Sequence, residues 1–297
     1  MPAEVRRRRT ARPQHYAMCP PEYFAVDYAI NPWMDPSRPT DATAALSQWQ
    51  ELCRVLRALG HVVDLVEPVP GLPDMVFAAN AATVVEGRVL VAAFRHRQRA
   101  PESAVFQAWF DAVGFDQVRR AARINEGEGD HLLVGDIILA GSGFRTETES
   151  QPETADYLRR QVVNLTLIDP RFYHLDTALT VLGPDQVMYY PDAFSPRSRA
   201  TLEHLFPQAL LADEQDAVAF GMNAISDGYH VVLPTAAAGL AVRLKERGYE
   251  PVSVNVDELM KAGGGPKCCT LNLRRAAGSK TLNPSGGEPT RPGPDSP

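Results

Sequence analysis

Two adjacent cysteines near the end of the chain are the first candidates for chemistry. Cys268 and Cys269 follow the glycine-rich stretch 263–267, and the residues after them alternate in a pattern that predicts a strand. Side chains on a strand point alternately to opposite faces, so Cys269 is expected to face the core and Cys268 the polar side. A cysteine at the edge of a glycine loop and beside Lys267 can have a lowered pKa and act as a nucleophile. A buried, inert cysteine is the competing interpretation.

A histidine and several carboxylates form the second group. His174 is followed two residues later by Asp176, and histidine can exchange protons near neutral pH while a carboxylate orients it or the substrate. Glu126, Glu128 and Asp130 alternate with glycines, which allow carboxylates to converge on one small cation. A guanidinium group is such a cation, because its planar N–H donors suit carboxylate partners. The alternatives are a surface histidine and a solvated acidic turn.

Alternating strand-like and helix-like segments must position these residues. Helical spacing of apolar residues predicts helices over 41–59, 102–113 and 236–247. Short apolar runs predict strands over 61–66, 87–93, 136–140, 161–167, 186–190, 229–233 and 251–256. This alternation predicts an α/β protein. Neither GxGxxG after the first strand nor GxxxxGK[ST] is present, so nothing supports a nucleotide-binding fold.

The composition divides the chain into one large domain and two polar ends. We expect 1–16 to be a flexible basic N-terminus, because its arginines cluster without apolar partners. Residues 17–275 should form the catalytic domain. The segment 276–297 is rich in Pro, Gly and Ser and is expected to be disordered.

The charge balance argues against several classes of protein. The formal net charge is -6, which does not suit a protein that coats nucleic acid or an anionic membrane. No apolar run approaches the roughly 18 residues of a membrane span, and no apolar stretch follows the basic residues as in a signal peptide. The four cysteines contain no CxxC pair, so neither a structural zinc site nor a disulfide framework is expected. We therefore expect a cytoplasmic protein with a small-molecule substrate.

Several segments, taken together and in order, resemble the guanidino-group-modifying superfamily. That superfamily includes arginine deiminases, dimethylarginine dimethylaminohydrolases, amidinotransferases and arginine dihydrolases, and the similarity is greatest to the dihydrolases. The segments are MCPPEYFAVDYAINPWM, PDMVFAANA, EGEGD, GFR, RFYHLDTA and AGGGPKC, and they extend from about Met18 to Leu273. The resemblance implies a five-bladed α/β propeller, the pentein fold, built from ββαβ units around a central channel.

The resemblance also implies the roles of the site residues, with neither metal nor organic cofactor. Cys268 matches the nucleophile, His174 the general acid and base, and Glu126 the catalytic glutamate. The expected substrate-binding residues are Asn31, Asn80, Arg99, Asp130, Arg145 and Asp176. Of these, the two arginines match residues that bind the substrate α-carboxylate. The two asparagines match positions that the dihydrolase group fills with asparagine, whereas a deiminase usually has aspartate at the position of Asn80.

The resulting hypothesis is a cysteine hydrolase that acts on the guanidinium group of arginine. The products would be ornithine, ammonia and carbon dioxide, or citrulline and ammonia, through a covalent thiouronium-type intermediate. One alternative is a dimethylarginine dimethylaminohydrolase, which releases citrulline and dimethylamine, and a less favoured one is an amidinotransferase. From another class, an inactive arginine-binding protein is possible, but the intact Cys268, His174 and Glu126 argue against it. The sequence leaves the exact substrate and the oligomeric state open, a homo-oligomer included.

Overall fold

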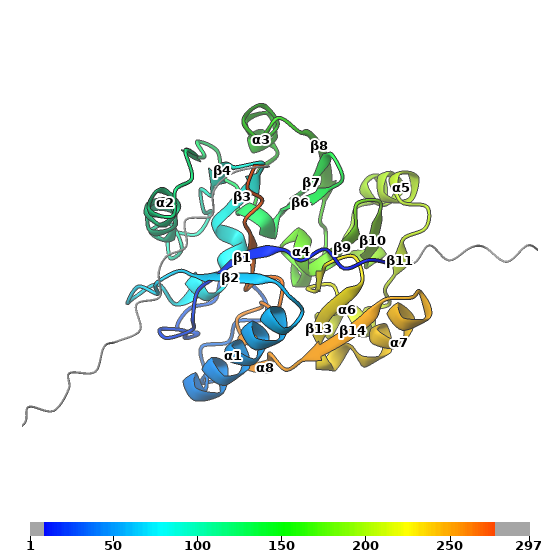
Figure 1. Cartoon of the computed structure of the whole chain (residues 1–297), viewed down its shortest axis with the longest axis horizontal. Coiled ribbons are helices and arrows are strands. Elements are labelled where there is room, and N and C mark those ends of the chain that lie inside the picture. Colours follow the sequence, from blue (N-terminus) through cyan, green and yellow to red (C-terminus); the bar gives the residue numbers. More distant parts are fainter. Residues whose placement is uncertain (1–8, 277–297) are drawn as a thin grey trace, which may run out of the picture.

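In the computed structural model, which describes residues 9–276, five three-stranded sheets surround a common centre (Figure 1). Each sheet has an inner strand that pairs antiparallel with a middle strand, and an outer strand that pairs parallel with the middle one. A helix makes each parallel crossover, as parallel neighbours require. The predicted five-bladed α/β propeller of ββαβ units is confirmed.

Four blades are continuous in the sequence. The first consists of β3 (Ala82–Val85), β4 (Arg88–Val91), α2 (Glu102–Ala112) and β5 (Gln117–Arg120), and the next of β6 (His131–Val134), β7 (Ile137–Ser142), α3 (Gln151–Leu158) and β8 (Gln161–Thr166). The third consists of β9 (Leu179–Gly183), β10 (Gln186–Tyr189), α5 (Pro196–Leu205) and β11 (Leu210–Leu211). The fourth consists of β12 (Ile225–Ser226), β13 (His230–Pro234), α7 (Ala238–Glu246) and β14 (Glu250–Val254).

The remaining blade joins the two ends of the described chain. Its middle and outer strands, β1 (His15–Met18) and β2 (Val62–Leu65), flank α1 (Ala42–Ala58), whereas its inner strand β15 (Leu271–Asn272) comes from the other end. β15 pairs antiparallel with β1, placing Tyr16 opposite Asn272. This pairing closes the ring, and the segment that carries Cys268 is thereby placed next to the first blade.

The local sequence explains where α1 begins and ends. The side chain of Asp41 accepts hydrogen bonds from two backbone amides of the first turn, and Gly60 with φ +88° follows the last turn. Trp49, Leu52 and Leu56 are buried on one face of the helix, which packs against the core. The helix predicted over 41–59 is confirmed to within one residue at each end.

The expected ends of the domain fall mostly outside the described residues. The predicted flexible segment 1–16 is described only from Arg9, and the predicted tail 276–297 only at its first residue. Within the described part, β1 already begins at His15, and the backbone N–H of Arg12 donates to the carbonyl of Asp227 at 2.8 Å. No helix between residues 9 and 276 is long and apolar enough to cross a membrane.

Candidate active site

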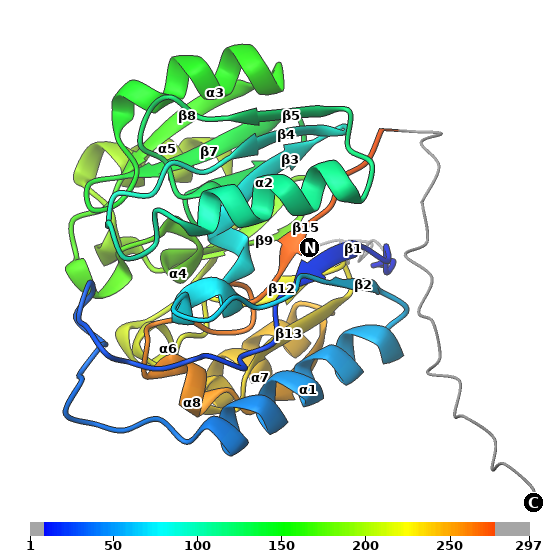
Figure 2. The ribbon, with the colours of Figure 1, turned by 90° about the vertical axis from the view of Figure 1, so that its left-hand side faces the viewer.

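Six of the nine candidate residues lie just before inner strands, whereas Asn31, Arg99 and Arg145 lie in loops that follow the middle strands β1, β4 and β7. A short helical turn precedes three of these strands: η2 (Ala78–Ala81) leads into β3, η3 (Gly127–Gly129) into β6 and α4 (Leu175–Ala178) into β9. Segments 221–224 and 267–270 lead into β12 and β15 in the same way. Figure 2 shows α4 at the end of the propeller away from β1. The five lead-in segments therefore bring residues from all five blades to one end of the channel.

Cys268 is held in a turn by an asparagine and an aspartate. Its backbone N–H donates to Oδ1 of Asn223 at 3.1 Å, and Nδ2 of Asn223 lies 3.0 Å from Sγ. The thiol lies 3.3 Å from Oδ2 of Asp176. The strand expected to begin at the cysteines is wrong, because residues 268–269 are in a turn and β15 begins only at Leu271. The contacts with Asn223, rather than strand alternation, direct the Cys268 thiol toward Asp176.

The thiol of Cys268 is poorly ionised in this environment. Burial raises its pKa well above the ordinary value, and the charge of Asp176 raises it further. The expected lowering by Lys267 is wrong, because Nζ of Lys267 points away to Oε2 of Glu128 and the carbonyl of Thr270, each at 3.1 Å. The nucleophile therefore needs an additional positive charge beside it, which a bound guanidinium cation would supply.

Asp176 is a buried carboxylate with one free oxygen. Burial raises its pKa to about 7, although the charge of Lys267 opposes this shift. Its Oδ2 faces Cys268, and its Oδ1 is buried without a hydrogen-bond partner among the described residues. A buried acceptor without a partner is costly, and the N–H groups of a cationic ligand would satisfy it.

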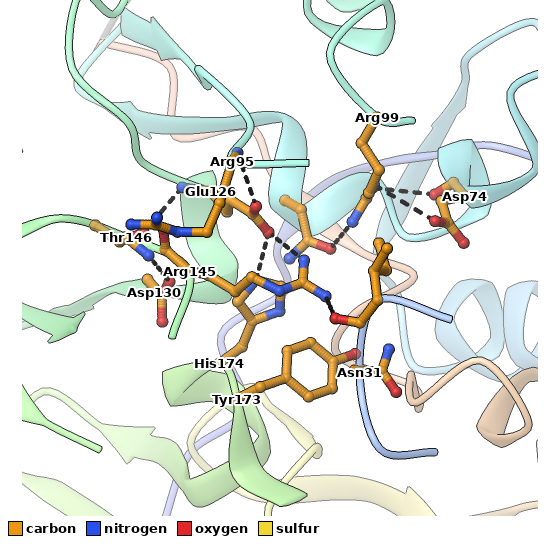
Figure 3. Close-up of polar contacts among 12 residues, drawn as sticks. Asn31, Asp74, Arg95, Arg99, Glu126, Asp130, Arg145, Thr146, Tyr173 and His174 are labelled. Atoms are coloured by element: carbon orange, nitrogen blue, oxygen red, sulfur yellow. Dashed lines mark hydrogen bonds and ion pairs between the residues drawn. The ribbon is translucent and has the colours of Figure 1, made fainter. Parts of the chain in front are cut away.

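His174, Glu126 and Arg145 form a second charged group (Figure 3). Oε2 of Glu126 lies 2.7 Å from Nε2 of His174 and 2.8 Å from Nη1 of Arg145. Burial alone would raise the pKa of Glu126, but the charges of Arg145 and His174 outweigh it, so the pKa lies below its usual range. Nδ1 of His174 has no partner within residues 9–276. The histidine is thus oriented by a carboxylate that stays ionised.

Arg145 and Tyr173 connect this group to the loops around it. Nη2 of Arg145 donates to the carbonyl of Ile30 at 2.9 Å, and its guanidinium lies 4.7 Å above the centre of the Tyr173 ring. The hydroxyl of Tyr173 donates to the carbonyl of Gly263 at 2.7 Å. Arg145 is therefore at the site, where its role in binding the substrate carboxylate remains a prediction.

Arg99 fixes the orientation of Asn80. Arg99 is 3% exposed, and its guanidinium donates from Nη1 to Oδ1 of Asn80 at 2.6 Å. Its Nε and Nη2 donate to Glu102 at 3.0 and 2.8 Å. Because a guanidinium can only donate, Oδ1 must face it, and Nδ2 of Asn80 is left buried without a partner. A Cβ atom added at Gly129 would collide with this Nδ2 and lie 3.2 Å from the His174 ring, so the free amide is beside the histidine.

The two remaining predicted residues make mostly backbone contacts. Asp130 accepts from the amides of Leu175 at 3.0 Å and Thr146 at 3.2 Å, and burial raises its pKa to about 6. It thereby holds the start of α4, the helix that His174 precedes. Asn31 donates from Nδ2 to the carbonyl of Ala262 at 3.0 Å, in the loop that leads to Cys268. Direct contact of either residue with substrate remains a prediction.

The sequence reasoning missed Asn223 and Glu102. Asn223 lies two residues before β12, and Asn80 lies two residues before β3. Comparison of the segments before each inner strand would have identified Asn223. Glu102 begins α2 and resembles any first-turn acidic residue, so only the structure reveals that it holds Arg99. Among the described residues, no group of three or more His, Cys, Asp or Glu side chains is arranged to hold a metal ion.

Known proteins resemble the chain over most of its length. Residues 18–275 match the family described as N,N dimethylarginine dimethylhydrolase, eukaryotic. The N(G),N(G)-dimethylarginine dimethylaminohydrolase of Mycobacterium tuberculosis is 50% identical over 266 residues, which cover 90% of this chain and 88% of that protein. The bifunctional arginine dihydrolase/ornithine cyclodeaminase ArgZ of Synechocystis is 38% identical over 262 residues, which cover 86% of this chain and 37% of that longer protein.

Solved structures show the same fold. The N-terminal domain of ArgZ, an arginine dihydrolase from cyanobacteria solved as a mutant bound to substrate, superposes with a TM-score of 0.84 at 36% identity. The match covers 88% of this chain and 98% of that domain. The dimethylarginine dimethylaminohydrolase of Pseudomonas aeruginosa has a TM-score of 0.75 at 18% identity over 88% of this chain and 99% of its own, and supports the fold alone.

The propeller and these relatives define the class of protein as a guanidino-group-modifying enzyme of the pentein superfamily. Within this class, the chain belongs to the dimethylarginine dimethylaminohydrolase family. It is a hydrolase of C–N bonds in linear amidines, and it acts on guanidino groups of the arginine type.

The tight contact at Gly129 generates a prediction. Gly129→Ala places a methyl group against Asn80 and His174, and we expect kcat/KM to fall roughly 10²-fold because the reacting groups are displaced. Gly239→Ala is the control, since its Cβ in α7 would meet Asp216 only at 3.5 Å. The control should keep full activity and unfold at a slightly higher denaturant concentration. Steady-state kinetics and urea unfolding test both variants, and equal activity of the two would contradict the assigned geometry.

Proposed function

We propose that the enzyme converts L-arginine to ornithine, carbon dioxide and two ammonia molecules in two hydrolytic rounds at one site. The observation that supports both rounds is the amide of Asn80, which Arg99 and Glu102 orient with its NH₂ group free beside His174. An aspartate in that place would offer only acceptors, whereas the amide offers a donor.

The first round begins with the substrate cation between the carboxylates of Asp176 and Glu126. The cation lowers the pKa of the Cys268 thiol, whose proton passes to His174, and the thiolate attacks the guanidinium carbon to give a tetrahedral adduct. His174 donates a proton to one terminal nitrogen, which departs as ammonia. The carbon remains bonded to Sγ of Cys268 as a thiouronium. A water molecule, deprotonated by His174, then attacks the same carbon, the C–S bond breaks, and citrulline forms.

The second round requires the neutral ureido group of citrulline to be retained. Its carbonyl oxygen is an acceptor that Nδ2 of Asn80 can bind, whereas a guanidinium presents only donors. Attack by Cys268 on the carbonyl carbon expels a second ammonia and gives a thiocarbamate. Hydrolysis of that thiocarbamate releases the carbamic acid of ornithine, which loses carbon dioxide. Asn80 thus determines whether the reaction stops at citrulline.

A second candidate is hydrolysis of dimethylarginine to citrulline and dimethylamine. It is favoured by the relative from Mycobacterium tuberculosis, which carries that name and is 50% identical. The same cysteine, histidine and glutamate would perform this reaction, with dimethylamine as the leaving group in place of ammonia.

Product analysis tests the choice between these functions. Completed reactions with arginine and with dimethylarginine are separated by amino-acid chromatography, and ammonia and dimethylamine are quantified. We expect ornithine with about two ammonia per arginine, and Asn80→Asp should shift the product toward citrulline because its donor is lost. Citrulline as the sole product of the unaltered enzyme would indicate a deiminase. Dimethylamine from dimethylarginine, with arginine untouched, would establish the second candidate.

The adjacent cysteines provide a matched pair for testing the nucleophile. Cys268→Ser should abolish turnover with the fold intact, because a hydroxyl is a far weaker nucleophile than a thiolate. Cys269→Ser should keep activity and lose stability by about 1–3 kcal/mol, because a hydroxyl is then buried where Cys269 is 0% exposed. Kinetics and denaturant unfolding measure both effects, and reversed phenotypes would assign the nucleophile to Cys269.

The pH profile should follow Asp176. Because its pKa is raised to about 7, its ionised fraction increases as the pH rises through that value, and kcat/KM should increase with it. Lys267→Met removes a charge that lowers this pKa, so the rise should move to higher pH. Lys261→Met removes a lysine paired with Glu258 and should leave the profile unchanged. If both variants keep the midpoint of the unaltered enzyme, Asp176 does not control the profile.

A further inference from the structure

A cavity of about 500 Å³ lies apart from the Cys268 group. Its wall includes residues between Arg9 and Tyr16, the β6–β7 and β9–β10 turns, and the segment 224–228. Figure 1 shows the chain before β1 crossing the propeller toward β11, over this region. None of Cys268, His174, Glu126 or Asn80 lines the cavity. It therefore occupies the hairpin-turn end of the channel, and the proposed reaction occupies the other end.

The cavity is lined by more cations than its carboxylates neutralise. Four basic residues contribute to its wall, namely Arg9, Arg12, Lys267 and Arg274. Lys267 and Arg274 share one carboxylate, that of Glu128, whose side chain is 1% exposed. One shared carboxylate leaves an excess positive charge at this wall.

The two acidic residues of the wall itself, Asp185 and Asp227, do not neutralise the remaining arginines. The side chain of Asp227 is fully buried, and its oxygens accept from the backbone amides of Tyr229 and His230 and face the His230 ring at 2.7 Å. Asp185 is exposed in the β9–β10 turn and makes no ion pair within the described chain.

Two hydrogen-bond donors of the wall have no protein partner. Tyr16 is 3% exposed and lines the cavity, yet its hydroxyl makes no hydrogen bond within residues 9–276. Burial raises its pKa above the ordinary value, so the hydroxyl stays protonated and can donate. The guanidinium of Arg12 likewise makes no hydrogen bond or ion pair in the described part of the chain. Arg12 is an exposed residue and Tyr16 a buried one, and both side chains can donate to a ligand in the cavity that they line.

The rest of the wall is mixed. Leu133, Val181, Leu182 and Ile225 contribute apolar surface. The volume exceeds the roughly 30 Å³ of one water molecule many times over, so a ligand larger than a single ion fits.

The geometry points to a binding site for a small organic anion, whose carboxylate or phosphate oxygens accept from Arg12, Tyr16, Lys267 and Arg274. Oxyanions match a set of groups that can only donate, and arginine and lysine are the side chains that bind them most strongly. The hydrocarbon part of the ligand lies against the apolar residues. Lys267 directly precedes Cys268, so one of the residues that bind the anion is next to the nucleophile in the sequence.

Titration calorimetry on the full chain at low ionic strength tests this site. The probes are succinate as a carboxylate, glycerol 3-phosphate as a phosphate ester, and sodium chloride at matched ionic strength. We expect saturable binding of at least one organic probe, with one site per chain, and no saturable heat from chloride. The organic probe that binds with the higher affinity identifies the preferred head group, carboxylate or phosphate. Binding of neither organic probe would overturn the proposal.

Variants locate the binding. Arg12→Ala and Tyr16→Phe should each weaken the affinity about tenfold, since a lost hydrogen bond to a charged ligand has that effect. The controls Arg38→Ala and Tyr23→Phe change exposed residues outside the cavity and should bind like the unaltered chain. If both cavity variants bind the probe with unchanged affinity, the probe does not bind in this cavity and the proposal is overturned.

Competition separates this site from the reaction site. The titration is repeated in Cys268→Ser saturated with arginine, and the organic probe should bind as before. Loss of binding under these conditions would place the anion in the substrate site and overturn the proposal. This test does not require the enzyme to convert arginine, because binding of the organic probe to the unliganded enzyme is measured first, in a separate titration.

Discussion

Buried carboxylates paired with cations from distant parts of the chain hold the centre of the propeller together. Glu126 and Glu128 are 0% and 1% exposed, and each is paired with basic residues that lie outside its own segment. An unpaired buried charge destabilises a protein by several kcal/mol, so the fold must bring each of these carboxylates to its basic partners. Glu128 is held by Lys267 and Arg274, on both sides of β15, and Glu126 by Arg145. The closing strand and the reaction site therefore depend on neighbouring residues of one segment.

The site extends from the reacting groups into a chain of oriented donors. Glu102 holds Arg99, Arg99 holds the carbonyl oxygen of Asn80, and the free amide hydrogens of Asn80 remain beside His174. Each link has its direction fixed by chemistry, because a carboxylate only accepts and a guanidinium only donates. Glu102, which makes no hydrogen bond to Asn80 itself, can in this way set what the amide presents to a ligand.

Sequence patterns predicted the α/β class, the middle and outer strands of most blades, and the helices α1, α2 and α7. They did not reveal the inner strands β3, β6, β9 and β12, which are two to five residues long and directly follow the short turns that carry site residues. Cys268 was identified from its glycine-rich context and a family resemblance, but the strand argument for its direction and the expected low pKa were wrong. Both errors have one cause: Asn223, Asp176 and Glu128 contact Cys268 or Lys267 only in three dimensions.

The pairing of β15 with β1 has a consequence for how the enzyme is made. Tyr16 pairs with Asn272, so the ring stays open until almost the whole described chain has been synthesised. Contacts so distant in sequence form slowly, because the loop between them must be ordered before they contribute stability. The four internal blades can form from local segments, whereas the turn with Cys268 is positioned only by the last closure. Catalytic competence should therefore appear after most secondary structure during refolding, which makes the return of activity a specific reporter of ring closure.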